Sequence, residues 1–324
     1  MIDAHGKVSI LTPCYNSAKF IHRLLDSVLE QTYPNIEMVV INDGSTDQSE
    51  EVILSYIPHF EKKGYTLRRI NQPNQGQGSA INNGLKLIAG DYLVWPDSDD
   101  YYASPLAIEK MVNVLEKNED YAMVRSFSNV LNEVSLIKIG EFGGEKFITK
   151  RKTDLFEDCL FLKNNFWFGA GNYMLRISQL FDNYPDKNIY ASTKHGGQNW
   201  QLLLPMLYKN KCYTIEENLY NILARTESHS RETFKTVTDQ IKKFEEHKNI
   251  IIQTLISIKE MPEPDREQYI NQIHTKYELI IIGLLCSIEK DEAKSRFYLL
   301  RKKYGKYIEL KNYLRIFYHI FFNR

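Results

Sequence analysis

Hydrophobic positions follow two different spacings along the first 130 residues. Short apolar runs, typical of buried strands, occur at 8–11, 36–41, 67–70 and 91–95. Between these runs, apolar residues recur every three or four positions, which is typical of an amphipathic helix. Helices are predicted over 21–29, through 52–56, over 79–88 and from 104 to about 117. This alternation predicts an α/β fold whose mostly parallel sheet is covered by helices on both faces.

The pattern changes beyond residue 130. A strand is predicted at 134–139 and a glycine-bearing loop at 140–149. Helices are predicted at 154–162, 177–181 and 200–208. From about residue 233 nearly every segment has helical spacing, interrupted at Pro262 and Pro264. We therefore expect an α/β domain over 1–230 and a helical C-terminal region over 231–324.

Composition limits the class of protein. The chain has 324 residues, of which 43% are hydrophobic and 25% charged, as in soluble globular proteins. The formal net charge is zero, which argues against a nucleic-acid partner. No signal peptide and no apolar run of membrane-spanning length is apparent, so a cytoplasmic protein is expected. The four cysteines are far apart, which indicates reduced thiols rather than disulfides or a zinc site; they are Cys14, Cys159, Cys212 and Cys286.

The end of the chain has a charge pattern of its own. Residues 291–324 contain nine Lys or Arg and three Asp or Glu, with many aromatic residues among them. Basic and aromatic residues at helical spacing suit peripheral contact with an anionic membrane. Packing of the aromatic face on the main domain and self-association are the alternatives.

Acidic residues follow two of the predicted strands. Asp97, Asp99 and Asp100 come directly after the run that ends at Trp95, and 42–47 follows the run that ends at Ile41. In an open α/β sheet, ligands bind at the carboxyl ends of the strands. Clustered carboxylates there suit a divalent cation, which also stabilises a departing diphosphate. A solvated acidic turn is the simpler alternative for either segment taken alone.

Three blocks together resemble family 2 glycosyltransferases: residues 8–16, 40–47 and 90–100. Their order and spacing match over roughly the first 125 residues. The resemblance implies a Rossmann-like GT-A fold and an inverting transferase that uses a nucleotide-sugar, a UDP-sugar above all. It also implies Mn²⁺ or Mg²⁺ as cofactor and a glycan or lipid-linked acceptor in cell-surface polysaccharide synthesis.

The same resemblance assigns roles to individual residues of the donor site. It implies nucleobase contacts from the turn after the first strand and from Asp43, and nucleotide contacts from the glycine-rich segment before the third helix. It implies that Asp97 faces the ribose or sugar, that Asp99 binds the metal, and that Asp100 is a further ligand or supports Asp99. The remaining donor-site residues are Thr12, Pro13, Tyr15, Gly76 and Asn82. A rigid turn at Pro13, and helix capping by Asp43 or Asp47, are the structural alternatives.

The expected catalytic base is missing. Many family members have Glu-Asp ahead of a tryptophan, but this chain has Gln198 and Asn199 ahead of Trp200. An amide cannot take a proton near neutral pH. Three readings remain: His195 is the base, Asn199 only positions the acceptor, or the site binds donor and transfers poorly. Helix capping by the amides and a surface position for His195 are the structural alternatives.

Two further classes of function compete with a transferase. A sugar nucleotidyltransferase would need glycine and basic residues after the first strand, and 12–17 contains neither. A non-catalytic donor-binding or scaffold protein would explain the missing acidic pair. Residues 225–231 resemble a family segment that approaches the diphosphate, with Arg225 and His229 as candidates, although a polar linker between domains is an equal reading.

Overall fold

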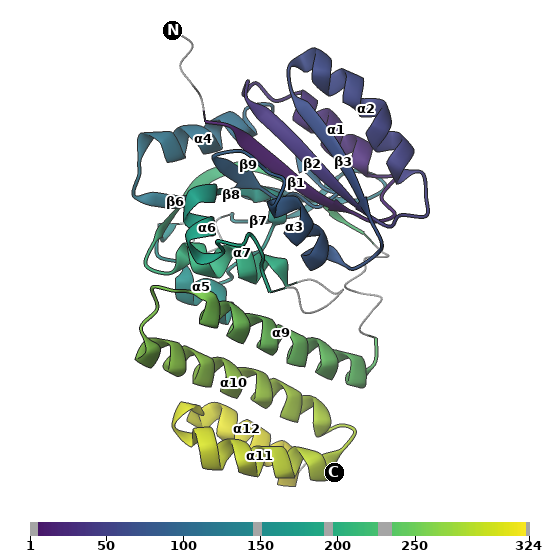
Figure 1. Ribbon diagram of the computed structural model, residues 1–324. Helices are drawn as coiled ribbons and strands as arrows, with labels where there is room; N and C mark the ends of the chain where they lie inside the picture. The colour runs from purple at the N-terminus through teal and green to yellow at the C-terminus, as the bar shows by residue number, and fades with distance from the viewer. Residues whose placement is uncertain (1–5, 145–150, 191–196, 226–234, 322–324) are drawn as a thin grey trace. The chain divides into compact units, whose positions relative to one another are not determined.

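Figure 1 shows a computed structural model of the chain, which describes residues 6–144, 151–190, 197–225 and 235–321. The chain forms two compact units, 1–226 and 227–324. His195, His229 and the expected domain boundary at residue 230 lie outside the described residues. Each unit is considered by itself.

The first unit is built on one mixed sheet in the order β3-β2-β1-β4-β8-β6-β9-β5, with β7 paired to β6. Its strands are β1 (Val8–Cys14), β2 (Ile36–Asp43), β3 (Thr66–Gln72), β4 (Tyr92–Val94), β5 (Tyr101–Tyr102), β6 (Tyr121–Asn132), β7 (Lys138–Phe142), β8 (Tyr173–Arg176) and β9 (Lys211–Ala224). The first four strands pair in parallel, as the apolar runs predict.

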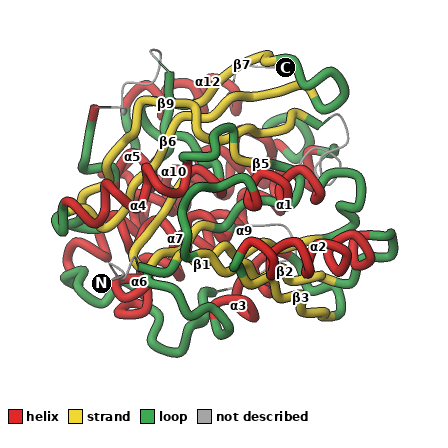
Figure 2. Tube along the Cα trace, turned by 90° about the horizontal axis from the view of Figure 1, so that it is seen from above, coloured by secondary structure: helices red, strands yellow, loops and turns green. Residues whose placement is uncertain are grey.

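Helices cover both faces of this parallel half. Every residue of β1 and β2 is buried. One face packs on α1 (Ile21–Leu29), α2 (Ser49–Lys63) and α4 (Ala107–Lys117), and the opposite face packs on α3 (Gln77–Leu85). Figure 2 shows α1 and α2 on one side of the strands and α3 on the other. Gly84 of α3 lies against Leu11 so closely that a Cβ atom there would come within 2.0 Å of Leu11 Cδ1.

The second half of the sheet was only partly predicted. β8 pairs antiparallel with both β4 and β6, whereas β6 and β9 run parallel to each other. The prediction of a strand at 134–139 was wrong in its bounds, because residues 133–135 form the turn of a hairpin and β7 begins at Lys138. Asn132 Oδ1 accepts hydrogen bonds from the backbone N–H groups of Val134 and Ser135, which stabilises that turn.

Three predicted helices follow in the first unit. They are α5 (Phe156–Phe161), α6 (Ile177–Asn183) and α7 (Gln198–Leu207), with a short 3-10 turn, η2 (Ala170–Asn172), before β8. Gly197 has a φ of 96°, a left-handed conformation that glycine adopts without strain, and it directly precedes α7. This glycine therefore sets the direction in which Gln198 and Asn199 enter the helix.

The second unit is helical, as predicted. It contains α9 (Val237–Ser257), α10 (Glu263–Leu285), α11 (Lys290–Tyr304), a 3-10 turn η3 (Gly305–Tyr307) and α12 (Leu310–Phe321). Pro262 and Pro264 lie at the start of α10, where proline is tolerated. Within the described part of the chain, no helix combines the length and hydrophobicity needed to cross a membrane. All four cysteines are free.

Candidate active site

Polar loops meet at the carboxyl ends of β1 and β2. Asn16, which has a left-handed φ of 47°, accepts a hydrogen bond at Oδ1 from Thr46 N (2.8 Å) and donates its backbone N–H to Ser45 Oγ (3.0 Å). Ala18 N donates to Asp47 Oδ2 at 3.0 Å. The two loops are therefore tied together residue by residue, and the edge of the sheet behind them is held in one arrangement.

Asp47 lies at the start of α2. Its Oδ1 accepts the backbone N–H of Ser49 at 3.0 Å and the Ser49 hydroxyl at 2.5 Å. Partial burial works against ionisation, but the hydrogen bonds from Ser49 and from Ala18 N outweigh it and hold the pKa of Asp47 below its usual range. Asp47 thus performs the helix-start role that the sequence left open between it and Asp43.

Asp43 is the anchor of the segment that leads into α3. Its side chain is 3% exposed. Oδ1 accepts from Gln72 Nε2 (2.6 Å) and from Gln75 N (2.8 Å), and Oδ2 accepts from Gly76 N (2.8 Å). Gly76, with a φ of 88°, is the residue immediately before α3. The carboxylate therefore positions the glycine-bearing N-terminus of α3 next to the end of β2.

The other expected donor-site residues have different surroundings. Tyr15 is 48% exposed, so its ring is available to a ligand. Pro13 is buried in β1 and pairs with Ile41, while Thr12 is buried and its Oγ1 has no hydrogen-bond partner among the described residues. Both polar atoms of Asn82 bond to the backbone of Ile189, at 3.0 and 2.7 Å. Asn82 thus fixes the segment before 191–196.

The acidic segment after β4 is braced from two sides. Ser98 Oγ lies 2.7 Å from Ser17 Oγ, in the loop after β1. Asp100, which is buried, accepts the backbone N–H of Leu223 at 2.9 Å. Asp99 Oδ2 lies 2.9 Å from Nη1 of Arg225, the residue after β9. The Asp97–Asp100 segment therefore joins the loop after β1 to the end of β9.

The three carboxylates perturb one another. Burial and the negative charge of Asp99 raise the pKa of Asp97 to about 7, although part of its surface stays accessible. Burial, together with the charges of Asp99 and Asp97, raises the pKa of Asp100 well above its usual range. Such a group is costly to keep ionised unless a cation is near. Oxygen donors that repel one another suit a hard divalent cation.

Asp97 and Asp99 could hold such a cation, but they supply only a small number of protein ligands. In the regions that the structure describes, no three His, Cys, Asp or Glu side chains converge as a metal-binding group. One oxygen of Asp100 is directed to the backbone of β9, so this residue fits a supporting position better than a ligand position. The donor set is thus one or two carboxylates, which matches the few protein ligands that Mg²⁺ takes when substrate phosphates complete its coordination.

The amide pair at the start of α7 reaches the same edge. Asn199 Oδ1 accepts a hydrogen bond from Trp95 Nε1 at 2.9 Å, and Trp95 is the residue after β4. Gln198 is buried and donates through Nε2 to Gln77 Oε1 at 3.1 Å, at the first turn of α3. The pair therefore lies beside the end of β4 and the N-terminus of α3, and its side chains contact Trp95 and Gln77.

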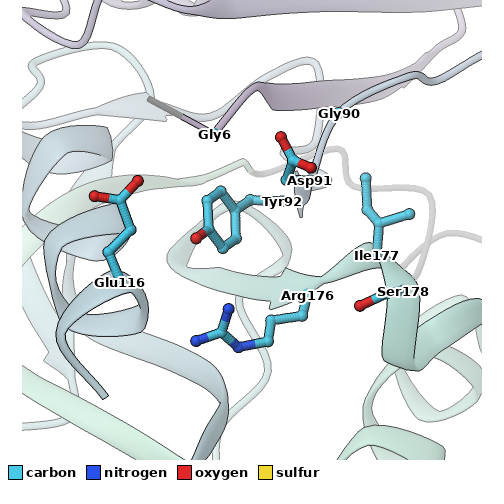
Figure 3. A pocket seen from close by; sticks show the side chains of 8 residues that line it. All are labelled: Gly6, Gly90, Asp91, Tyr92, Glu116, Arg176, Ile177 and Ser178. Carbon is cyan, nitrogen blue, oxygen red and sulfur yellow. The ribbon is translucent and has the colours of Figure 1, made fainter. Parts of the chain in front are cut away.

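A pocket of about 600 Å³ lies elsewhere in the first unit (Figure 3). It is lined by Gly6, Gly90, Asp91, Tyr92, Glu116, Arg176, Ile177 and Ser178. These residues surround the N-terminal ends of β1 and β4, at the edge opposite the acidic segment. The Arg176 guanidinium bonds the carbonyls of Leu115 and Tyr121, and Asp91 accepts Lys7 N. Two of its charged groups, Arg176 and Asp91, are thus engaged in structural contacts.

Comparison with known sequences identifies relatives of one kind. The sequence model of glycosyl transferase family 2 matches residues 9–182. An uncharacterized glycosyltransferase of Rickettsia felis is 46% identical over 34% of this chain and 17% of the relative. Another, from Rickettsia bellii, is 26% identical over 96% of this chain and 54% of the relative. The chain thus spans about half, or less, of the length of these curated relatives.

Solved structures resemble the chain over nearly its whole length. The structure of S. aureus TarS residues 1–349 in complex with UDP-GlcNAc has a TM-score of 0.64 at 17% identity, and the likeness covers 97% of this chain and 87% of those residues. The mannosyltransferase PcManGT of Pyrobaculum calidifontis, in complex with GDP-Man and Mn²⁺, has a TM-score of 0.54 at 15% identity, over 98% of this chain and 85% of PcManGT. These likenesses confirm the predicted GT-A-like α/β fold with a helical C-terminal region.

Proposed function

Because this chain belongs to glycosyl transferase family 2, we propose that it transfers a sugar from a nucleotide-sugar to a hydroxyl group of a glycan or lipid-linked acceptor, with inversion. The observation that carries this proposal is the convergence of the Asp97–Asp100 segment, the Asp43 anchor and the exposed Tyr15 ring at one sheet edge. The transferred sugar is a hexose or an N-acetylhexosamine.

The donor is proposed to be a UDP-sugar. The ring of Tyr15 stacks on the nucleobase, and Asp43 accepts the uracil N–H. A carboxylate has about four acceptor positions, and Asp43 has three hydrogen bonds in the protein. Thr12, Pro13 and Gly76 are buried and support the nucleotide surface from within the fold, and Asn82 supports it through Ile189. The UDP-GlcNAc of TarS favours uridine, whereas the GDP-Man of PcManGT makes guanosine the competing base.

Asp99 and Asp97 are proposed to hold Mn²⁺ or Mg²⁺, with Asp100 as support. A divalent cation supplies electrostatic stabilisation to the diphosphate that leaves. The chain's own part is to place two accessible carboxylates at the end of β4, and Asp100 does so by bonding Leu223 N. Preorganised charge of this kind is usually the largest contribution to catalysis.

Proton removal from the acceptor is proposed to involve His195 or water, because Gln198 and Asn199 cannot be bases. With its Oδ1 bonded to Trp95, Asn199 presents its amide nitrogen as a hydrogen-bond donor that orients the acceptor. Gln198 stabilises the N-terminus of α3 through Gln77. His195→Ala is therefore expected to lower turnover without weakening the binding of the nucleotide.

The same amide pair supports a second candidate function. A protein that binds the donor and does not transfer the sugar would keep the carboxylates and the nucleotide surface while dispensing with a base. The engagement of both amides within the protein favours this alternative. Nucleotide binding without turnover on any acceptor would distinguish it from the transferase.

The helical unit is proposed to touch the cytoplasmic face of a membrane, where lipid-linked acceptors of polysaccharide synthesis are assembled. On α12, Leu310, Leu314 and Tyr318 are exposed at four-residue spacing, and Lys311 and Arg315 lie between them. Such a helix binds anionic headgroups through its basic residues and acyl chains through its apolar face. Leu314→Glu is expected to abolish co-sedimentation with phosphatidylglycerol vesicles.

Calorimetric titration tests the donor assignment. UDP, GDP, CDP and TDP are titrated into the protein with and without Mn²⁺, and again into Asp99→Asn and the matched control Asp91→Asn, whose residue lies at the other end of β4. We expect Mn²⁺-dependent binding of UDP that Asp99→Asn weakens and Asp91→Asn leaves unchanged. Selective binding of another nucleotide would overturn the uridine assignment, and no binding of any nucleotide would overturn the proposed function. A panel of UDP-sugars then identifies the sugar by turnover.

A further inference from the structure

Arg225 forms an ion pair with the carboxylate assigned to the metal. Its Nη1 lies 2.9 Å from Asp99 Oδ2, and each of the two side chains is only 25% exposed. The contact joins residues 126 positions apart in the sequence. A half-buried, charge-assisted hydrogen bond of this length is stronger than an ordinary surface ion pair.

One contact of the guanidinium and one of the adjoining strand support this position. Its central carbon lies 4.5 Å from the ring centre of Phe20, a distance typical of a cation–π contact. Two residues earlier, the backbone N–H of Leu223 donates to Asp100 Oδ1 at 2.9 Å, so the end of β9 is attached to the acidic segment. Arg225 is therefore positioned beside Asp99 by strand β9 and by Phe20 of the loop after β1.

The charge of Arg225 is needed where it lies. The carboxylates of Asp97, Asp99 and Asp100 are crowded at the end of β4, and their repulsion is relieved by protonation or by a nearby cation. The guanidinium supplies one positive charge to this cluster. A divalent cation that binds Asp99 would have to approach the same carboxylate, against the repulsion of that charge.

We propose that Arg225 is the built-in counter-ion of the free protein, and that it must leave Asp99 before a divalent cation is fully bound there. Once released, the guanidinium remains tethered to β9 and stacked near Phe20, and its planar set of N–H donors suits the oxygens of a diphosphate. Metal and nucleotide would then bind together, each removing an obstacle to the other. This inference rests on the proposed function, because it takes Asp99 as the metal ligand.

The proposed exchange predicts opposite changes in two affinities, that for the metal and that for UDP. A double and a single positive charge about 6 Å apart repel, even at the dielectric constant of water, by an amount equal to about a tenfold change in affinity. Removing Arg225 should therefore tighten metal binding in the absence of nucleotide. It should also weaken the binding of UDP in saturating Mn²⁺. A residue that merely oriented Asp99 would change both affinities in the same direction, as would a folding defect.

Electron paramagnetic resonance of free Mn²⁺ measures the affinity for the metal, and calorimetry in saturating Mn²⁺ measures the affinity for UDP. Arg225→Gln is compared with the wild type and with Arg69→Gln, a matched control whose side chain is also 25% exposed and pairs with Glu50. We expect Arg225→Gln to bind Mn²⁺ about tenfold more tightly and UDP several-fold more weakly, while Arg69→Gln resembles the wild type. Asp99→Asn in combination with Arg225→Gln should abolish the gain.

The other possible results of these titrations would overturn either the exchange or the proposed function. Unchanged or weaker Mn²⁺ binding by Arg225→Gln would overturn the exchange, including the case in which neither protein binds Mn²⁺ alone. A gain that survives Asp99→Asn would also overturn it, since the metal would then bind elsewhere. Failure of UDP to bind the wild type under any condition would instead show that the proposed function is wrong, and this titration is read independently of the metal affinity.

Discussion

Asp43→Asn should weaken the fold and the nucleotide site together. The carboxylate accepts three hydrogen bonds, two at Oδ1 and one at Oδ2. An amide can keep the two bonds of Oδ1, but it places an NH₂ group against the backbone N–H of Gly76. One charge-assisted hydrogen bond is lost and two donors face each other in a buried site, which together cost about 2–4 kcal/mol. The segment before α3 then loses its anchor.

Urea unfolding followed by tryptophan fluorescence measures this cost. All three tryptophans lie in the first unit, so the signal reports on the unit that contains Asp43. The matched control is Gln72→Met, which removes the Nε2 donor to Asp43 and the Oε1 acceptor of Asn83 Nδ2, and leaves the carboxylate with both backbone partners. We expect the control to lose about 1–2 kcal/mol, less than Asp43→Asn. Equal midpoints and slopes for Asp43→Asn and the wild type would refute the anchoring argument.

Nucleotide binding separates the two roles of Asp43. If the carboxylate also accepts the uracil N–H, Asp43→Asn should weaken UDP binding by about tenfold or more, because a charge-assisted bond is lost. Gln72→Met should bind UDP nearly as the wild type does. If the loss of UDP affinity is in proportion to the loss of unfolding free energy in both variants, Asp43 acts on the nucleotide only through the position of α3.

Three further variants test other parts of the molecule. Asn199→Asp keeps an acceptor for Trp95 Nε1 and adds a base, so turnover on an identified acceptor should rise about a hundredfold or more; an unchanged rate would place the base elsewhere. Gly84→Ala should lower the free energy of unfolding in urea by about 1–3 kcal/mol, because the added Cβ meets Leu11, and an unaltered midpoint would contradict this packing. Burial, followed by the charge of Lys243, holds the pKa of His247 at about 4, below its ordinary 6.5. The unfolded chain takes up the proton first as pH falls from 6.5 toward 4, so stability should be lost over that range by about 3 kcal/mol. Circular dichroism should show a smaller loss in His247→Gln.

The strands that are buried on both faces could be predicted from the sequence, and the strands of the second half could not. β1 and β2 are continuous apolar runs, because helices cover both of their faces. β9 carries Glu216 and Glu217 in its middle, and exposed positions interrupt its apolar residues. It forms a strand because its parallel partner β6 supplies the backbone hydrogen bonds, a tertiary cause that no local pattern contains.

The candidate site, too, could be predicted only in part from the sequence. The acidic residues at the ends of β2 and β4 could be located because the carboxyl edge of a parallel sheet gathers its loops, and the predicted family resemblance is confirmed. The partners of those residues could not be predicted. The family resemblance placed Asp99 and Arg225 near the same diphosphate, but their direct contact and that of Asn82 with Ile189 depend on how the mixed second half of the sheet packs against the parallel half.

Asn199 illustrates why the fold alone cannot decide between a transferase and a donor-binding protein. Trp95 Nε1 can only donate a hydrogen bond, so position 199 must provide an acceptor, and that acceptor lies at 2.9 Å. Asparagine and aspartate both meet this requirement. The exchange of a carboxylate for an amide therefore costs the fold little, while it removes a group that can take a proton. Intact packing around Trp95 is thus expected in both kinds of protein, and the turnover of the wild type, measured beside that of Asn199→Asp, distinguishes them.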